Sequence, residues 1–270
     1  MKILKVSLII FLLVFLSSCN LNYNYNNHSK YIESSSFSLD SEITELNISW
    51  VNGNINILQS KDAKITVHEE NFGDFPMYYY LNGTVLNIEY VKHGTRNDDI
   101  NDLEKDLNIV LPNSSNMTLD IDLINGNCEL DSDDSLQASA YKSIEIELVN
   151  GNINFNSLVY SMNDIKIDYV NGNVNAINGV VAESDISIER INGSVNIMIA
   201  SAKSINIETV NGSDKLLIPT ELGYKLDFDS VSGIAHCNGQ YIYGDEHIEI
   251  DYESVNADLT ISLYESMPNW

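Results

Sequence analysis

A short motif recurs along this chain, and its spacing constrains the fold more than any other feature. An apolar residue followed by Asn-Gly begins at Val51, Ile124, Val149, Val170, Ile191 and Val210, and degenerate copies begin at Val231 and Val255. From Ile124 the starts are 25, 21, 21, 19, 21 and 24 residues apart. A period near 21 is too short for a pair of helices but suits one coil of a β-solenoid.

The sequence before each motif alternates strictly between apolar and polar residues, as in Ile144-Glu-Ile-Glu and Ile165-Lys-Ile-Asp. Such a period of two indicates a strand with one buried face. Asn-Gly then tolerates positive φ and turns the chain before a second short strand. The glycines expected to form these structural corners are Gly53, Gly126, Gly151, Gly172, Gly193, Gly212 and Gly233.

These patterns predict an all-β fold, a right-handed parallel β-solenoid (β-helix) with coils of about 21 residues stacked in chain order. Asn-Gly also forms hairpins, so an antiparallel sandwich is the alternative; near-identical text in one register favours the solenoid. We expect a signal peptide over 1–18, a flexible Asn-rich tether over 19–36 and an irregular N-terminal β cap with the first corner over 37–115. Solenoid repeats follow over 116–265, with a tail over 266–270.

The first residues predict export. Lys2 and Lys5 precede the short apolar run Leu8–Leu16, which ends in Ser-Ser-Cys19. The run is shorter than the roughly 20 apolar residues of a membrane span. Its ending resembles the bacterial lipobox, in which the cysteine is lipid-modified. We therefore expect an extracytoplasmic protein of the bacterial cell envelope, attached to the membrane by lipid at Cys19.

The charge of the chain limits its partners. Fourteen basic residues stand against 39 acidic ones, for a net charge of −25, and without the two lysines of the signal peptide the balance is 12 − 39 = −27. Such a chain as a whole repels nucleic acid and anionic lipid headgroups, and we therefore expect no nucleic-acid partner. Cationic partners or divalent metal ions are favoured.

One register is acidic throughout. From the Ile124 copy onward, the residue two positions before each corner is an acid in all seven repeats, namely Asp122, Glu147, Asp168, Glu189, Glu208, Asp229 and Glu253. Stacked coils would bring these like charges about 4.8 Å apart, which is destabilising by itself. One hypothesis is a ladder that binds Ca²⁺ or a cationic surface, because Ca²⁺ prefers oxygen ligands. The alternative is a solvated face whose repulsion is screened by salt.

The remaining chemistry is weak. The asparagines of the corners are expected to bond one another and the turn backbone rather than sugar hydroxyls. Cys128 and Cys237 occupy apolar positions five coils apart, roughly 24 Å, so two buried free thiols are expected. The tyrosines, such as Tyr78–Tyr80, leave carbohydrate binding open. No nucleophile, phosphate-binding or zinc motif is present in the sequence, and we expect no enzyme.

The order of these features over Phe37 to Leu263 resembles the bacterial adhesin-type β-solenoid family with repeated G-x-I corners (head-GIN type). The resemblance is carried by Gly53-Asn-Ile55, by Val110-Leu-Pro112 and Leu217-Ile-Pro219, and by the late Ser232-Gly233 corner. It implies an adhesin-like interaction protein of the cell envelope, whose surface or protein ligand is unknown, with no catalytic residues to transfer. An envelope-stress sensor or regulatory module is the alternative, followed by a polysaccharide-active β-helix enzyme.

Overall fold

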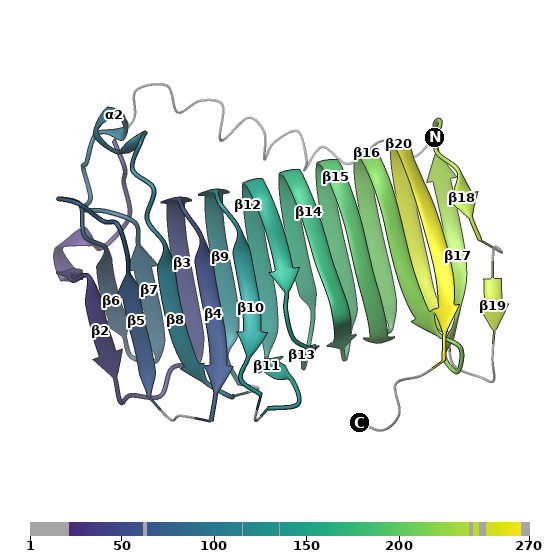
Figure 1. Ribbon diagram of the computed structural model, residues 1–270, viewed down its shortest axis with the longest axis horizontal. Helices are drawn as coiled ribbons and strands as arrows, with labels where there is room; N and C mark the ends of the chain where they lie inside the picture. Colours follow the sequence, from purple (N-terminus) through teal and green to yellow (C-terminus); the bar gives the residue numbers. More distant parts are fainter. Residues whose placement is uncertain are drawn as a thin grey trace.

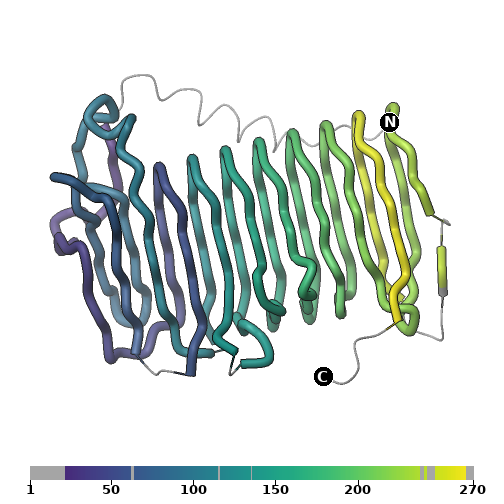
Figure 2. Tube along the Cα trace, viewed as in Figure 1, coloured from purple at the N-terminus to yellow at the C-terminus, as the bar shows by residue number. Residues whose placement is uncertain are grey.

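The structure, a computed structural model, describes residues 22–61, 64–114, 116–134, 136–237, 240–242 and 247–265. It is all-β, with 67% strand and 3% helix, and its sheet is open and does not close into a barrel. This confirms the predicted class. The strands lie side by side along the long axis of the molecule (Figure 1), and the chain passes repeatedly between a near and a far layer of strands (Figure 2).

The central part consists of parallel strands that pair like with like. Its elements are β9 (Thr118–Asn125), β10 (Cys128–Ser132), β11 (Ser139–Tyr141), β12 (Ser143–Phe155), β13 (Val159–Ser161), β14 (Ile165–Ala182), β15 (Asp185–Ser201) and β16 (Ser204–Pro219). Between β12 and β14, Ile144 pairs with Ile165 and Gly151 with Gly172. Strands β12, β14, β15 and β16 run through their Asn-Gly corners, where the sequence suggested two separate strands.

The core lies between the two layers. Along β12 the inward residues before the corner are Ile144, Ile146 and Leu148, and those after it are Ile153 and Phe155; none is more than 2% exposed. Each such side chain contributes about 1.5–3 kcal/mol relative to an exposed one. The alternation of the sequence therefore defines the buried columns directly.

The corners require glycine for two reasons. Gly193 has a φ of +131°, a region that residues with a side chain rarely adopt. A Cβ on Gly193 would also lie 1.6 Å from the carbonyl oxygen of Gly172 in the neighbouring strand. The glycines thus form a column of close backbone contacts. It continues from Gly212 through Ala257 to Gly233 on one side and ends against the backbone of Lys105 on the other.

At the N-terminal end, two strands that follow the first corner in the sequence pair on its outer side. Its elements are η1 (His28–Lys30), β1 (Ile32–Glu33), β2 (Ser36–Leu39), β3 (Glu45–Asn52), β4 (Ile55–Ser60), β5 (Ile65–Glu69), β6 (Tyr78–Asn82), β7 (Val85–Glu89), α2 (Asn97–Ile100) and β8 (Leu107–Pro112). Strands β3 and β4 pair with β9 and β10 in parallel, so the first corner stacks directly on the second. Strands β7 and β8 pair with β3 and β4 on their outer side, and β2, β5 and β6 continue the sheet in antiparallel fashion.

The C-terminal end departs from the expected chain order. Its elements are β17 (Gly223–Ser230), β18 (Ala235–His236), β19 (Gln240–Ile242) and β20 (Ile248–Tyr264). Strand β20 pairs with the whole length of β16 and, on its other side, with β17. The repeat that begins at Val255 therefore lies between those that begin at Val210 and Val231. Stacking in simple chain order is thus wrong for the last two repeats.

Residues 22–36, for which we expected a flexible tether, pack against the N-terminal end. Asn22 forms a β-bridge with Arg96, and the backbone of Tyr23 bonds Thr95 and Gly94. The hydroxyl of Tyr23 donates to the carbonyl oxygen of Ser49 at 3.1 Å. The asparagines gave this segment the composition of a linker, whereas its tyrosines supply the surface that packs. The signal peptide, Cys19 and the tail over 266–270 lie outside the described residues.

Candidate functional site

The structure places the seven acids of the predicted ladder in one column on the outer face of a layer. Going along the stack, Asp122 pairs with Glu147, Glu147 with Asp168, and the register continues through Glu189, Glu208, Glu253 and Asp229. Glu253 precedes Asp229 because β20 lies between β16 and β17. At the other end the column continues through Ser49 to Glu89, two members that the motif alignment did not include. We call this set the acidic column.

A second column beside it is mixed and contains one cation. It includes Asp120, Glu145 and Lys166, which are paired in register. The Lys166 ammonium lies 2.7 Å from a carboxylate oxygen of Glu145 and 3.1 Å from one of Asp168. Within the described part of both columns, Lys166 is the single basic side chain, so acids outnumber bases on this face.

Crowding and burial disfavour the charged form of several of these acids. The pKa of Glu147 rises to about 7 because the carboxyl is half-buried and faces Asp122 and Asp168, with Lys166 acting in the opposite direction. The pKa of Asp120 rises to about 6, first through burial and then through Asp122 and Glu145. Buried Glu89 has its pKa raised to about 7 although two tyrosine hydroxyls donate to it. The face therefore gains negative charge as pH rises toward neutrality.

The same face carries a hollow of about 440 Å³ beside the acidic column. Its lining includes Glu45, Asp120, Glu145, Lys166 and Asp185.

The acidic column is a line of residues and not a cage. Among the residues that the structure describes, no group of three or more His, Cys, Asp or Glu side chains is placed to hold a metal ion. Ca²⁺ takes six to eight oxygen ligands that converge on one point. Each carboxylate inside the column instead has one neighbour on either side, so the geometry offers a repeated charge more readily than a metal centre.

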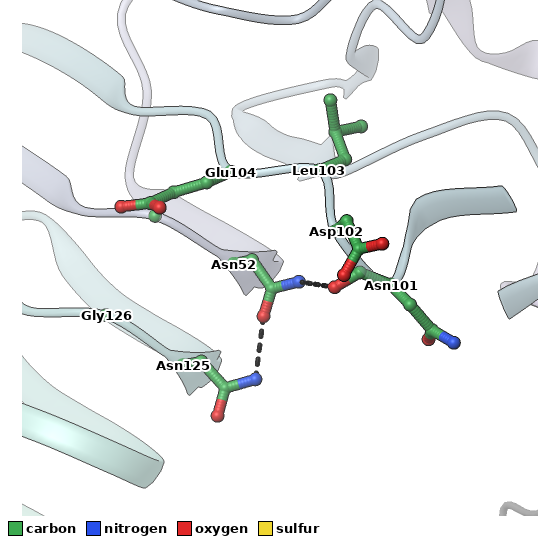
Figure 3. A pocket seen from close by; sticks show the side chains of 8 residues that line it. Asn52, Asn101, Asp102, Leu103, Glu104, Asn125 and Gly126 are labelled. Carbon is green, nitrogen blue, oxygen red and sulfur yellow. Dashed lines mark hydrogen bonds between the residues drawn. The ribbon is translucent and has the colours of Figure 1, made fainter. Parts of the chain in front are cut away.

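The corner asparagines form a ladder of amide hydrogen bonds. Asn150 Nδ2 donates to Asn125 Oδ1 at 2.9 Å, and Asn171 donates to Asn150 in the same way. Figure 3 shows the N-terminal end, where Asn125 donates to Asn52 and Asn52 donates to the carbonyl oxygen of Asn101. The expectation that these side chains bond one another is confirmed. The ladder explains the Asn of the motif by stability and does not by itself indicate a ligand.

Two buried ion pairs escaped the sequence analysis. Asp214 accepts hydrogen bonds from Arg190 Nη2 at 2.7 Å, from the Tyr252 hydroxyl at 2.7 Å and from the backbone of Val195 at 2.8 Å. Both charged side chains are fully buried. A signal was available, because Asp214 stands where the neighbouring repeat has Val195. The pair is inside the core, which gives it a structural role.

The second buried pair joins Lys105 and Glu69 at the N-terminal end, with 3.0 Å between nitrogen and oxygen. Lys105 also donates to the carbonyl oxygens of Phe75 and Tyr90 and lies 4.9 Å from the ring centroid of Trp50. Burial lowers the pKa of Lys105 to about 8, although Glu69 raises it in part.

The two cysteines of the described chain are free. Cys128 is buried, as expected, and burial raises the pKa of its thiol to about 12. The expectation of a buried thiol is wrong for Cys237, which is half-buried and packs at the edge of the core. Neither thiol has the lowered pKa of a reactive nucleophile.

No helix within the described ranges is long and apolar enough to cross a membrane. Lipid attachment at Cys19 lies outside those ranges and stays a prediction.

Comparisons with known proteins give distant structural likenesses only. No family model matches the chain, and no curated protein matches it. The fold is similar to the "putative cell adhesion protein" of Clostridium sporogenes, with 15% identity, coverage of 85% of this chain and 99% of that one, and a TM-score of 0.34. It is also similar to the "putative adhesin" of Bacteroides fragilis (14%, 86% and 97%, 0.38) and to that of Parabacteroides merdae (11%, 90% and 100%, 0.40). Because these TM-scores are below 0.5, we base no functional conclusion on them.

Proposed function

We propose that this chain is a non-catalytic, adhesin-like interaction protein of the bacterial cell envelope, anchored by lipid at Cys19, which binds positively charged partners through its acidic column. The register of the acidic column carries this proposal, since it aligns seven carboxylates that the fold does not need for its core. Like charges in adjacent strands cost stability. A binding role gives that cost a purpose, since a cationic partner would relieve the repulsion.

The rigid spacing of the strands supports the same reading. We propose a right-handed parallel β-solenoid with coils of about 21 residues, consistent with the 21-residue separation of Asn150 and Asn171 in the amide ladder. Such a scaffold presents one carboxylate about every 4.8 Å. A repeated array of this kind binds a repeated cation, such as a lysine-rich surface, by many weak contacts rather than by one pocket.

The test measures binding of a fluorescent decalysine peptide to the purified chain at low salt. Replacing Glu147, Asp168 and Glu189 together with Gln, Asn and Gln should weaken binding about tenfold, since each surface ion pair contributes about 0.2–1 kcal/mol. The matched control replaces three acids away from the acidic column, Glu70, Glu129 and Asp131, by their amides. Equal loss in both triple variants would reduce the effect to net charge and refute the role of the acidic column.

Calcium assistance is tested in the same samples. Melting temperatures with Ca²⁺, with Mg²⁺ and with chelator should coincide if the acidic column acts as a linear charge array. A rise of several degrees with Ca²⁺ alone, absent from the triple variant of the acidic column, would instead make metal bridging part of the binding mode.

A further inference from the structure

The N-terminal end of the molecule carries a surface whose chemistry differs from the rest. It lies beside β6 and α2, at the end of the stack opposite β17 (Figure 1). Its members come from two segments, 22–32 and 90–97. We call it the N-terminal patch, and its residues are Tyr25, His28, Lys30, Tyr31, Ile32, Lys92, His93 and Arg96.

Ring contacts hold the aromatic members together. The Tyr25 ring centroid lies 4.7 Å from that of Tyr31 and 5.4 Å from that of His93. His28 stacks on His93 at 4.1 Å, with 7° between the ring planes. Tyr31 in turn contacts Tyr80 at 5.5 Å. The aromatic side chains therefore form one continuous cluster.

Backbone and side-chain hydrogen bonds join the two segments. The backbone N–H of Tyr25 donates to His93 Nδ1 at 3.1 Å, and the backbone N–H of His93 donates to the Tyr25 hydroxyl at 3.0 Å. Asn22 and Arg96 form a bridge beside them. The N-terminal patch is thus a fixed surface, and the chain before Asn22 must leave from its edge.

The charge of the N-terminal patch is opposite to that of the protein. Segments 22–32 and 90–97 contain Lys30, Lys92 and Arg96 and no Asp or Glu, in a chain of net charge −25. Of the acids that face this surface, Glu89 is buried beneath two tyrosine hydroxyls. Asp98 lies 3.3 Å from Arg96, and Glu33 accepts a hydrogen bond from Tyr78. Lys30 and Lys92 are exposed and remain available to an external anion.

An apolar residue completes this combination. Ile32 is 56% exposed, next to Tyr31. Tyrosines with an exposed aliphatic side chain and flanking lysines are the residues that favour the interface between water and a lipid bilayer. Lysines add attraction to anionic headgroups, which decays within about 10 Å.

The length of chain between anchor and patch provides the second observation. Asn22 follows Cys19 by three residues. Three residues span at most about 10 Å when fully extended. A lipid on Cys19 would therefore hold the edge of the N-terminal patch within about 10 Å of the bilayer surface.

We propose that the N-terminal patch docks on the membrane that holds the anchor, with Lys30 and Lys92 against anionic phospholipid headgroups and Tyr25, Tyr31 and Ile32 in the interfacial layer. This inference rests on the lipid anchor of the proposed function. Docking fixes the end of the stack at the bilayer and directs the strongly acidic remainder, which the same headgroups repel, away from it.

The first experiment places a reporter in the lipidated full chain, reconstituted into vesicles of phosphatidylglycerol and phosphatidylcholine. Ile32→Trp should be quenched by brominated lipid, whereas Ile177→Trp, at a site 57% exposed near the middle of the stack, should not. The native tryptophans, Trp50 and Trp270, are common to both variants and give the same background. An anchored protein in which neither reporter is quenched would refute docking and leave the lipid anchor intact.

The second experiment removes the anchor. The Cys19→Ser chain should bind vesicles with phosphatidylglycerol and should not bind vesicles of phosphatidylcholine alone. Lys30→Glu with Lys92→Glu should weaken this binding by about thirtyfold or more, at about 1 kcal/mol per lysine near an anionic surface. The control pair, Lys203→Glu with Lys215→Glu, makes the same charge change on exposed residues elsewhere. Equal binding by the two double variants, or none by Cys19→Ser, would overturn the proposal, and a missing acyl group on Cys19 in the native chain would refute the anchor separately.

Discussion

The hydroxyl of Tyr252 donates a hydrogen bond of 2.7 Å to the carboxylate of Asp214, although 38 residues separate the two in sequence. Tyr252 lies on β20 and Asp214 on β16, which pair in parallel. This bond therefore lies where β20, the last strand of the chain, is inserted between β16 and β17, although β20 follows β17 in the sequence. It also links that strand to the buried Arg190.

Removing one partner of the Arg190–Asp214 pair should lower the free energy of unfolding strongly, whereas replacing both partners by apolar residues should change it little. Asp214→Val alone should destabilise the fold by about 3–5 kcal/mol, because it leaves Arg190 charged and buried. Arg190→Met with Asp214→Val should recover most of that loss, since Val195 shows that the register accepts valine. Chemical denaturation of the two single variants and the double variant measures the coupling. Additive losses would show that the pair is not coupled.

The glycine column predicts a large effect from one methyl group. Gly193→Ala should cost at least about 3 kcal/mol, because its Cβ would overlap the backbone oxygen of Gly172 and the strands would have to separate. Gly83→Ala is the control, since φ there is +64° but nothing lies within 4 Å of the added atom. That variant should lose only about 1–2 kcal/mol from its backbone conformation. An equal decrease in melting temperature for Gly193→Ala and Gly83→Ala would contradict the packing argument.

The stability of the N-terminal end of the fold should depend on Lys105. Lys105→Met should destabilise the protein by about 3–5 kcal/mol, because it removes the donor from Glu69 and from two backbone carbonyls. Adding Glu69→Gln should restore part of the loss, since the uncompensated charge is then gone. Hydrogen exchange of β5 and β8 locates the effect. Unchanged protection of these strands would refute the assignment.

Deprotonation of the acidic column should decrease the stability of the fold as pH rises toward neutrality. The pKa of Glu147 is raised to about 7 in the folded protein, so the folded state binds more protons than the unfolded state between about pH 4.5 and 7. Its favourable contribution is complete below that window and is lost as pH rises through 7. Glu147→Gln should therefore raise the melting temperature by a few degrees at pH 8 and change it little at pH 4; after screening by solvent the gain is about 1 kcal/mol. A gain of equal size at both pH values would indicate a cause other than titration.

The repeated part of the fold could be read from the sequence because one rule recurs in it. Alternation placed Ile144 and Ile146 inside, and the period aligned Asp122, Glu147 and Asp168 on one outer column. Each repeat meets a near copy of itself, so a local pattern is enough to fix the register.

The two ends could not be derived in this way, because a terminal strand has no neighbour of its own kind to specify it. Lys105 continues the column of corner glycines through its backbone alone, with a sequence unlike any corner. At the other end a signal existed: Asn256 continues the amide ladder from Asn211, whereas the Val231 copy has Ser232 at that position. The N-terminal patch depends on 22–32 meeting 90–97, which no period predicts.

The position of β20 also has a consequence for how the molecule is completed during synthesis. Chains are synthesised from the N-terminus, so β17 is available before β20 has followed it. Yet, among the strands that the structure describes, β17 has its parallel partner only in β20, and β16 likewise pairs with β20 on its open side. The final seventeen-residue strand thus completes the sheet by joining β16 to β17. A chain that is cut short before Ile248 would leave one edge of β16 and one edge of β17 without their parallel partner, instead of forming a shorter stack.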